Sequence, residues 1–225
     1  MSQLAKVVVG SRLHGLENEN SDWDYRGIHS HPLRDILSPF KTLKNTSWIE
    51  GAVDDTSYEL ADFCKLATKG NATYLEVFFS NQVIETSPVH EEMQSNWKKF
   101  MDTEAFIRAS LGYAHNQKNK FEERDPVGVR GQLRRHKFSI AYARVMWQCI
   151  EFLKTGEFKC QIDEGEFRDV LLRWKNNWSD EFTMEAIKLY YEQEAEIEDL
   201  WTKTEFMYKP DIDYIEDFIL RSYTK

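Results

Sequence analysis

The sequence lacks any long hydrophobic run and contains little cysteine, glycine or proline. Its 225 residues include 3 Cys, 10 Gly and 5 Pro. No apolar stretch reaches the roughly 18 residues of a membrane span, which excludes a helix of that kind. Three scattered cysteines are too few for a disulfide framework or a zinc cluster. Because 41% of the residues are hydrophobic and 14% aromatic, a disordered chain is also excluded. The N-terminus has no signal-peptide pattern, so we expect a cytoplasmic protein.

Positive charge is scarce as well. The chain has 29 Lys and Arg against 38 Asp and Glu, a net charge of −9. This balance excludes a protein that coats nucleic acid without preference, because such binding needs clustered cations. Residues 118–144 are an exception, with 8 basic and 3 acidic residues. This basic segment predicts either a local phosphate site or a solvent-exposed helix face.

The hydrophobic pattern changes near residue 90. Before it, short apolar or alternating runs predict strands over 4–9, 22–28 and 54–60 and a helix over 61–68. After it, helical periodicity dominates, and we expect helices over 104–124, 130–155, 164–175, 181–203 and 211–222. The sequence therefore predicts an α+β protein: a small mixed-sheet domain over 1–100, followed by a helical domain over 101–225.

Two acidic residues stand out on the second expected strand. Alternation places Asp22 and Asp24 on one face, roughly 6–7 Å apart along the strand. Two carboxylates at this spacing repel each other unless a cation lies between them, and Mg²⁺ prefers such oxygen ligands. Gly10 and Ser11 follow the first strand, where a glycine allows a phosphate to approach the backbone and a hydroxyl can donate to it. An Asp-x-Asp pair alone would equally fit a solvated strand edge.

A third acidic residue is expected to complete such a site. On a regular strand over 54–60, Glu59 and Asp55 share one face, and Asp54 faces the other way. Glu59 has apolar neighbours on both sides, so its carboxylate would point away from them. We therefore favour Glu59 as the third carboxylate, with Asp55 as the competing candidate.

These motifs resemble those of polymerase-β-type nucleotidyltransferases, and more narrowly the RNA repair pathway DNA polymerase β family of bacteria and phages. The residues that carry the resemblance are Gly10-Ser-Arg-x-x-Gly15, Ser21-Asp-x-Asp-Tyr-Arg-Gly27, Tyr58-Glu-Leu-x-x-Phe63 and Gly70-Asn-Ala-x-x-Leu-Glu76. Weaker similarity continues in Ala114-x-x-Gln117-x-x-Lys120, Leu153-x-Thr-Gly156 and Lys209-Pro-Asp211. The chain departs from the family pattern at Ala72, where Pro is usual, and at Ala141, where His is frequent.

The resemblance implies transfer of a nucleoside monophosphate from an NTP to a hydroxyl group, with release of pyrophosphate. The acceptor would be an RNA or DNA end, a small molecule or a protein. Mg²⁺, or Mn²⁺ as an alternative, would be held by Asp22, Asp24 and Glu59. Phosphate contacts would come from Gly10, Ser11, Arg12 and Arg26. We expect no membrane partner, and the sequence leaves the oligomeric state open.

The basic segment offers further nucleotide contacts. If its two sides are helical, Gln117 and Lys120 share one face, and Lys137, Ala141 and Arg144 share another. We select Lys120, Lys137 and Arg144 as nucleotide-binding candidates, because the family resemblance extends to them. Each would otherwise be an ordinary solvent-exposed cation.

Two functions of other classes compete with an enzyme. One is an antitoxin-like module that binds a protein partner on the same fold. The other is a catalytically silent nucleic-acid-binding protein. An intact set of carboxylates argues against the second, because uncompensated negative charge would repel phosphate.

Overall fold

The structure is a computed structural model that describes residues 1–43, 46–48, 54–123 and 129–224. The chain divides into two compact units. The first comprises residues 1–105 and 208–225, and the second comprises residues 106–207. Residues 208–225, which the sequence placed in the helical domain, therefore pack with the N-terminal unit. The two units are described separately below.

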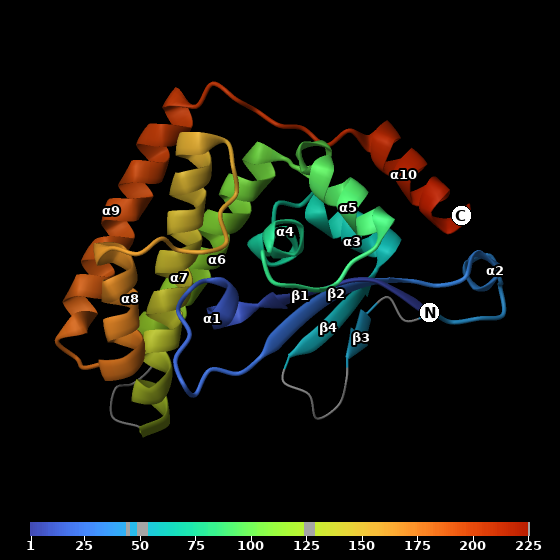
Figure 1. The fold of residues 1–225 in the computed structure, drawn as a ribbon. Coiled ribbons are helices and arrows are strands. Elements are labelled where there is room, and N and C mark those ends of the chain that lie inside the picture. Colours follow the sequence, from blue (N-terminus) through green and yellow to red (C-terminus); the bar gives the residue numbers. More distant parts are fainter. Residues whose placement is uncertain (44–45, 49–53, 124–128, 225) are drawn as a thin grey trace. The chain divides into compact units, whose positions relative to one another are not determined.

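Among the described residues, five strands of the first unit form one sheet in the order β3-β4-β2-β1-β5. Figure 1 labels β1 to β4 of this sheet. The strands are β1 (Ser2–Val9), β2 (Asp24–Ser30), β3 (Thr46–Trp48), β4 (Asp55–Glu59) and β5 (Val83–Glu85). Neighbouring strands are antiparallel except β2 and β4, which run parallel. A short helical turn, α1 (Gly10–Leu13), follows β1, and another, α2 (Leu33–Ile36), follows β2.

One face of this sheet is buried beneath helices. Strand pairing places Val7, Ile28 and Tyr58 on that face, and Val7 and Ile28 are almost fully buried. Figure 1 shows α3, α4 and α5 on one side of the sheet. Tyr58 makes an edge-to-face contact with Tyr74 of α4, with 5.1 Å between ring centroids. The helices are α3 (Leu60–Ala67), α4 (Ala72–Phe79) and α5 (Pro88–Ser95), and a 3₁₀ turn (Trp97–Phe100) follows them.

Side chains at the helix N-termini explain where these helices begin. Glu59, Asn71 and Ser87 each accept a hydrogen bond from a backbone N–H of the first turn of α3, α4 and α5. Gly70, with φ +68°, allows the turn between α3 and α4. The apolar residues 73–79 therefore lie within the helix α4.

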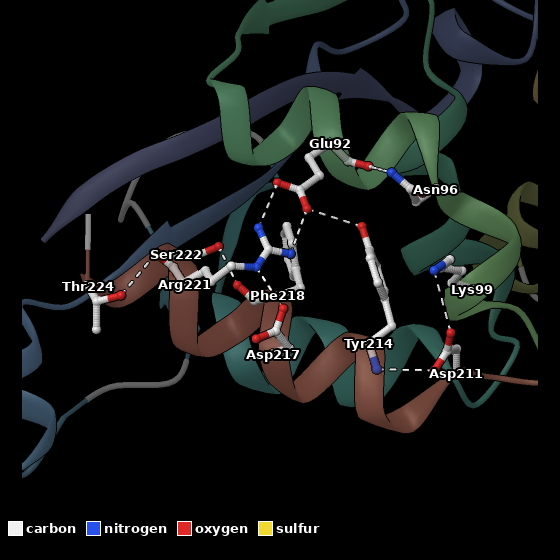
Figure 2. Close-up of polar contacts among 10 residues, drawn as sticks. All are labelled: Glu92, Asn96, Lys99, Asp211, Tyr214, Asp217, Phe218, Arg221, Ser222 and Thr224. Atoms are coloured by element: carbon white, nitrogen blue, oxygen red, sulfur yellow. Dashed lines mark hydrogen bonds and ion pairs between the residues drawn. The ribbon is translucent and has the colours of Figure 1, made fainter.

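The chain returns to the first unit after residue 207. The backbone N–H of Thr103 donates to the carbonyl of Tyr208 at 3.1 Å, and the Tyr208 N–H donates to Oγ1 of Thr103 at 2.9 Å. The last helix, α10 (Ile212–Thr224), then docks on α5. Figure 2 shows Arg221 paired with Glu92, at 2.9 Å, and the Tyr214 hydroxyl donating to the same carboxylate, at 3.2 Å.

The second unit is helical. It is built from α6 (Thr103–Glu123), α7 (Val129–Thr155), α8 (Glu166–Asn177) and α9 (Phe182–Lys203), with the first turn of α6 belonging to the first unit. Helices α7 and α9 pack along each other. The Tyr142 hydroxyl donates to the carbonyl of Ala186 at 2.6 Å, and the Gln193 amide donates to that of Ala143 at 3.0 Å.

The structure confirms the predicted α+β class, with the mixed sheet at the N-terminus and mostly helices after it. Over the described residues, no helix combines the length and the apolar character that crossing a membrane requires.

Candidate active site

The end of β1 and the starts of β2 and β4 lie together at one edge of the sheet. The acidic residues are at the starts of β2 and β4. Because β1 is antiparallel to β2, its last residue, Val9, lies opposite Asp24, the first residue of β2. Because β4 is parallel to β2, its first residue, Asp55, lies opposite Tyr25. The Tyr25 N–H donates to the carbonyl of Asp54 at 2.9 Å, just before β4 begins. The topology therefore brings Asp54 to the same edge as Asp24.

Gly10 leaves space for the Asp24 carboxylate. Its backbone has φ +70°, a conformation that residues other than glycine rarely adopt. A Cβ atom built on Gly10 would overlap Oδ2 of Asp24 and lie only 3.2 Å from its Cγ. The glycine of the Gly-Ser pair is thus required for packing against the acidic residue as well as for its backbone turn. Ser11 follows it, half-buried, in α1.

The carboxylates at this edge repel one another. Burial raises the pKa of Asp24, and the neighbouring Asp54 and Asp22 raise it further, whereas Arg26 and Arg12 oppose the shift. The guanidinium of Arg26 lies 3.7 Å from Asp54. Arg26 and Arg12 do not fully offset burial and the neighbouring acids, so the pKa of Asp24 stays raised. A bound divalent ion would favour the ionised carboxylate.

Arg12 holds the loop that precedes β2. Its Nη2 donates to the carbonyl of Ser21 at 2.7 Å, and its Nε donates to that of Asp22 at 3.2 Å. Its guanidinium also lies 4.0 Å from the ring centroid of Trp23. The structure therefore gives Arg12 a positioning contact with the Asp22 backbone. The Asp22 side chain itself is exposed.

The structure does not bring Glu59, the sequence-favoured third carboxylate, to this edge. It lies at the far end of β4, five residues from Asp54 and about 16 Å along the strand, on the opposite face. One carboxylate oxygen accepts the Ala61 N–H at 2.9 Å, and the other accepts the Tyr223 hydroxyl of α10. Only 7% of the residue is exposed. Glu59 thus caps α3 and anchors the last helix.

The competing candidate, Asp55, also faces away from the Asp24 side of the sheet. It shares its face with Tyr25 and forms an ion pair with Lys6 at 2.7 Å. Asp54, which the sequence set aside, is the acidic residue beside Asp24. The available signal was the adjacent pair Asp54-Asp55 at the point where β4 begins. A single sequence does not show which strands pair, so the register of β4 against β2 could not be predicted.

The remaining nucleotide-binding candidates belong to the second unit. Lys120 on α6 and Lys137 on α7 have exposed side chains. Arg144 on α7 is half-buried and donates to Oε1 of Gln148 at 3.0 Å. Their contact with a nucleotide stays a prediction.

Asp22, Asp24 and Asp54 have the chemistry of a magnesium site, since all their donor atoms are carboxylate oxygens. The mutual repulsion at Asp24 and the space left by Gly10 fit the same interpretation. In the part of the chain that is described, however, no three His, Cys, Asp or Glu side chains are already gathered around a metal position.

Comparison with known proteins agrees with the resemblance seen in the motifs. The model of the RNA repair pathway DNA polymerase beta family matches residues 3–165. An uncharacterised protein of Methanocaldococcus jannaschii is 26% identical over 166 residues, which cover 72% of this chain and 64% of that protein. An uncharacterised 38.9 kDa protein of Enterobacteria phage T4 is 29% identical over 143 residues, which cover 58% of this chain and 40% of that protein. The matches thus span less than two thirds of either relative.

Proposed function

Because the chain belongs to the RNA repair pathway DNA polymerase beta family, we propose that it is a nucleotidyltransferase. It would transfer a nucleoside monophosphate from an NTP to a hydroxyl group. The hydroxyl oxygen forms a bond to the α-phosphorus, the bond from that phosphorus to the bridging oxygen breaks, and pyrophosphate leaves. The observation that carries the proposal is the Asp24 carboxylate, which packs against Gly10 in the turn after β1 and has a pKa raised by the nearby charges of Asp54 and Asp22.

Each residue at this edge has a role under the proposal. Ser11 and the backbone N–H groups after Gly10 hold the phosphates. Asp54 accepts the proton of the attacking hydroxyl, and Arg12 keeps Asp22 in place through its backbone. Mg²⁺, held by Asp22, Asp24 and Asp54 when bound, supplies the charge that neutralises the attacking and leaving oxygens. Under this proposal Asp54, and not Glu59, is the third carboxylate.

We propose an RNA or DNA end as the acceptor, because the family description refers to RNA repair and to a DNA polymerase. A nucleic-acid end offers a free hydroxyl and also repels an acidic protein. The net charge of −9 therefore predicts that binding depends on the metal and on local cations. A small-molecule or protein hydroxyl would be revealed by the same experiment.

The test is to incubate the full chain with each of four α-labelled NTPs, Mg²⁺ and separate pools of RNA, DNA, protein and metabolites. We expect pyrophosphate release and label on nucleic acid, both lost in Asp24→Ala and on chelation of the metal. Turnover that persists in Asp24→Ala would remove the mechanism. Tight binding of a protein partner or of nucleic acid without turnover would favour a binding module instead.

A further inference from the structure

A buried histidine–glutamate pair joins the α1 turn to helix α4. Nε2 of His14, the residue that follows α1, lies 3.2 Å from Oε1 of Glu76 on α4. The two residues are only 4% and 5% exposed. Burying an imidazole and a carboxyl group costs free energy unless the two groups pair. Moving the turn away from α4 would separate them, so the pair links two segments that are far apart in the chain.

The chain that follows α4 contacts the same part of the molecule. Oγ of Ser80 donates to the carbonyl of Val8, near the end of β1, at 2.9 Å. The Gln82 side-chain amide donates to the carbonyl of Arg12, within the α1 turn, at 3.4 Å. Together with the His14 contact, these bonds make α4 and the residues after it the support on which the turn lies.

His14 also takes part in the backbone hydrogen bonds that close the turn. Its N–H donates to the carbonyl of Gly10 at 3.2 Å, and the Leu16 N–H donates to that of Ser11 at 2.9 Å. The same residue thus carries a closing bond to Gly10 and the side-chain contact to α4. Because Gly10 packs against the Asp24 carboxylate, the position of this turn also sets the space available to that acid.

We infer that His14 and Glu76 are positioning residues, which fix the turn on which the phosphates of the NTP bind. This inference rests on the proposed function. Both side chains are shielded from solvent, so they act through the backbone of the turn and not by contact with the NTP. The inference also gives a role to the motif Gly70-Asn-Ala-x-x-Leu-Glu76, which the carboxylates and the turn left without one.

The central variant is the double substitution His14→Phe with Glu76→Leu. It replaces both polar groups by apolar side chains, so no unpaired group stays buried, and a pair exchanged in this way often keeps its stability. Two measurements are made on the full chain. Amide hydrogen exchange followed by NMR reports whether the turn is fixed. Calorimetry with inorganic tripolyphosphate and Mg²⁺ reports phosphate binding, independently of any acceptor.

In the double variant we expect faster exchange at the N–H groups of residues 14 and 16. The dissociation constant for tripolyphosphate should rise about 10- to 100-fold, the usual cost of losing a group that orients a binding residue. Glu76→Gln should retain most of the affinity, because its amide oxygen can still pair with the imidazole. Glu59→Leu is the matched control: it removes another buried carboxylate of the first unit, and should leave tripolyphosphate binding unchanged.

Each other outcome has a definite meaning. Unchanged exchange at residues 14 and 16 would overturn the inference, since apolar packing would then hold the turn equally well. Faster exchange with unchanged tripolyphosphate affinity would also overturn it, because phosphate binding would not need a fixed turn. Failure of the unmodified protein to bind tripolyphosphate or any NTP would contradict the proposed function, and the inference with it. This last result is measured without any substitution, so it is distinct from failure of the pair alone.

Discussion

Replacing Glu59 should cost stability without abolishing chemistry. Its carboxylate accepts the Ala61 N–H at the start of α3 and the Tyr223 hydroxyl of α10, and the residue is 7% exposed. In Glu59→Ala both bonds are lost. An N-terminal cap contributes about 0.5–2 kcal/mol, and a buried hydroxyl left without its acceptor costs about 1–3 kcal/mol. The free energy of unfolding should therefore fall by roughly 2–4 kcal/mol, allowing for partial relaxation.

The assay is urea unfolding followed by far-UV circular dichroism, with turnover measured separately where the variant is folded. Tyr223→Phe is the matched control, because it removes only the hydroxyl and leaves the cap of α3 intact. We expect this variant to lose about 1 kcal/mol. If Glu59→Ala instead kept its stability and lost turnover completely, Glu59 would belong to the reacting site. The purely structural role assigned to it here would then be wrong.

Three further predictions concern the site and its surroundings. Gly10→Ala should lower stability by about 1 kcal/mol or more and abolish turnover, because its Cβ would displace the Asp24 carboxylate and φ is +70°; chemical denaturation and pyrophosphate release measure the two effects, and normal turnover would contradict the reasoning. Arg12→Ala should reduce kcat, and more strongly than Arg12→Lys does, because the loop before β2 loses two hydrogen bonds and a ring contact. Steady-state kinetics of both variants measures this, and equal kcat values would contradict the reasoning. Burial lowers the pKa of His90, so the folded state disfavours its proton, and stability should be complete above the usual pKa of about 6.5 and fall below it; the loss between neutral and mildly acidic pH should be smaller in His90→Gln, and an identical loss would assign it to other groups.

Local patterns were enough to predict most elements of the fold. The expected helix over 181–203 matches Phe182–Lys203, and that over 130–155 matches Val129–Thr155, because long amphipathic runs have a clear period. The association of α10 with the first unit was not predictable in this way. It depends on contacts such as Arg221 with Glu92, which join residues far apart in the chain.

Local sequence patterns also selected some residues of the candidate site. Gly10 and Asp24 are brought together by the antiparallel pairing of β1 with β2. The motifs selected both residues, but they did not predict that the two pack against each other. The third acid depends on the parallel register of β4 on β2, in which Tyr25 lies opposite Asp55. A face assignment made within one strand carries no information about its neighbour. Glu59 was preferred because its neighbours are apolar, and a buried residue that caps α3 has the same neighbours.

A direct comparison of two adjacent acids tests the central claim. Asp54 faces the Asp24 side of the sheet, whereas Asp55 pairs with Lys6 on the other side. Pyrophosphate release with NTP, Mg²⁺ and a nucleic-acid acceptor should fall by at least about 100-fold in Asp54→Asn, in line with loss of a positioned acid–base group. Asp55→Asn should stay within a few-fold of the unmodified protein. Full activity in Asp54→Asn, or its loss in Asp55→Asn alone, would contradict the account.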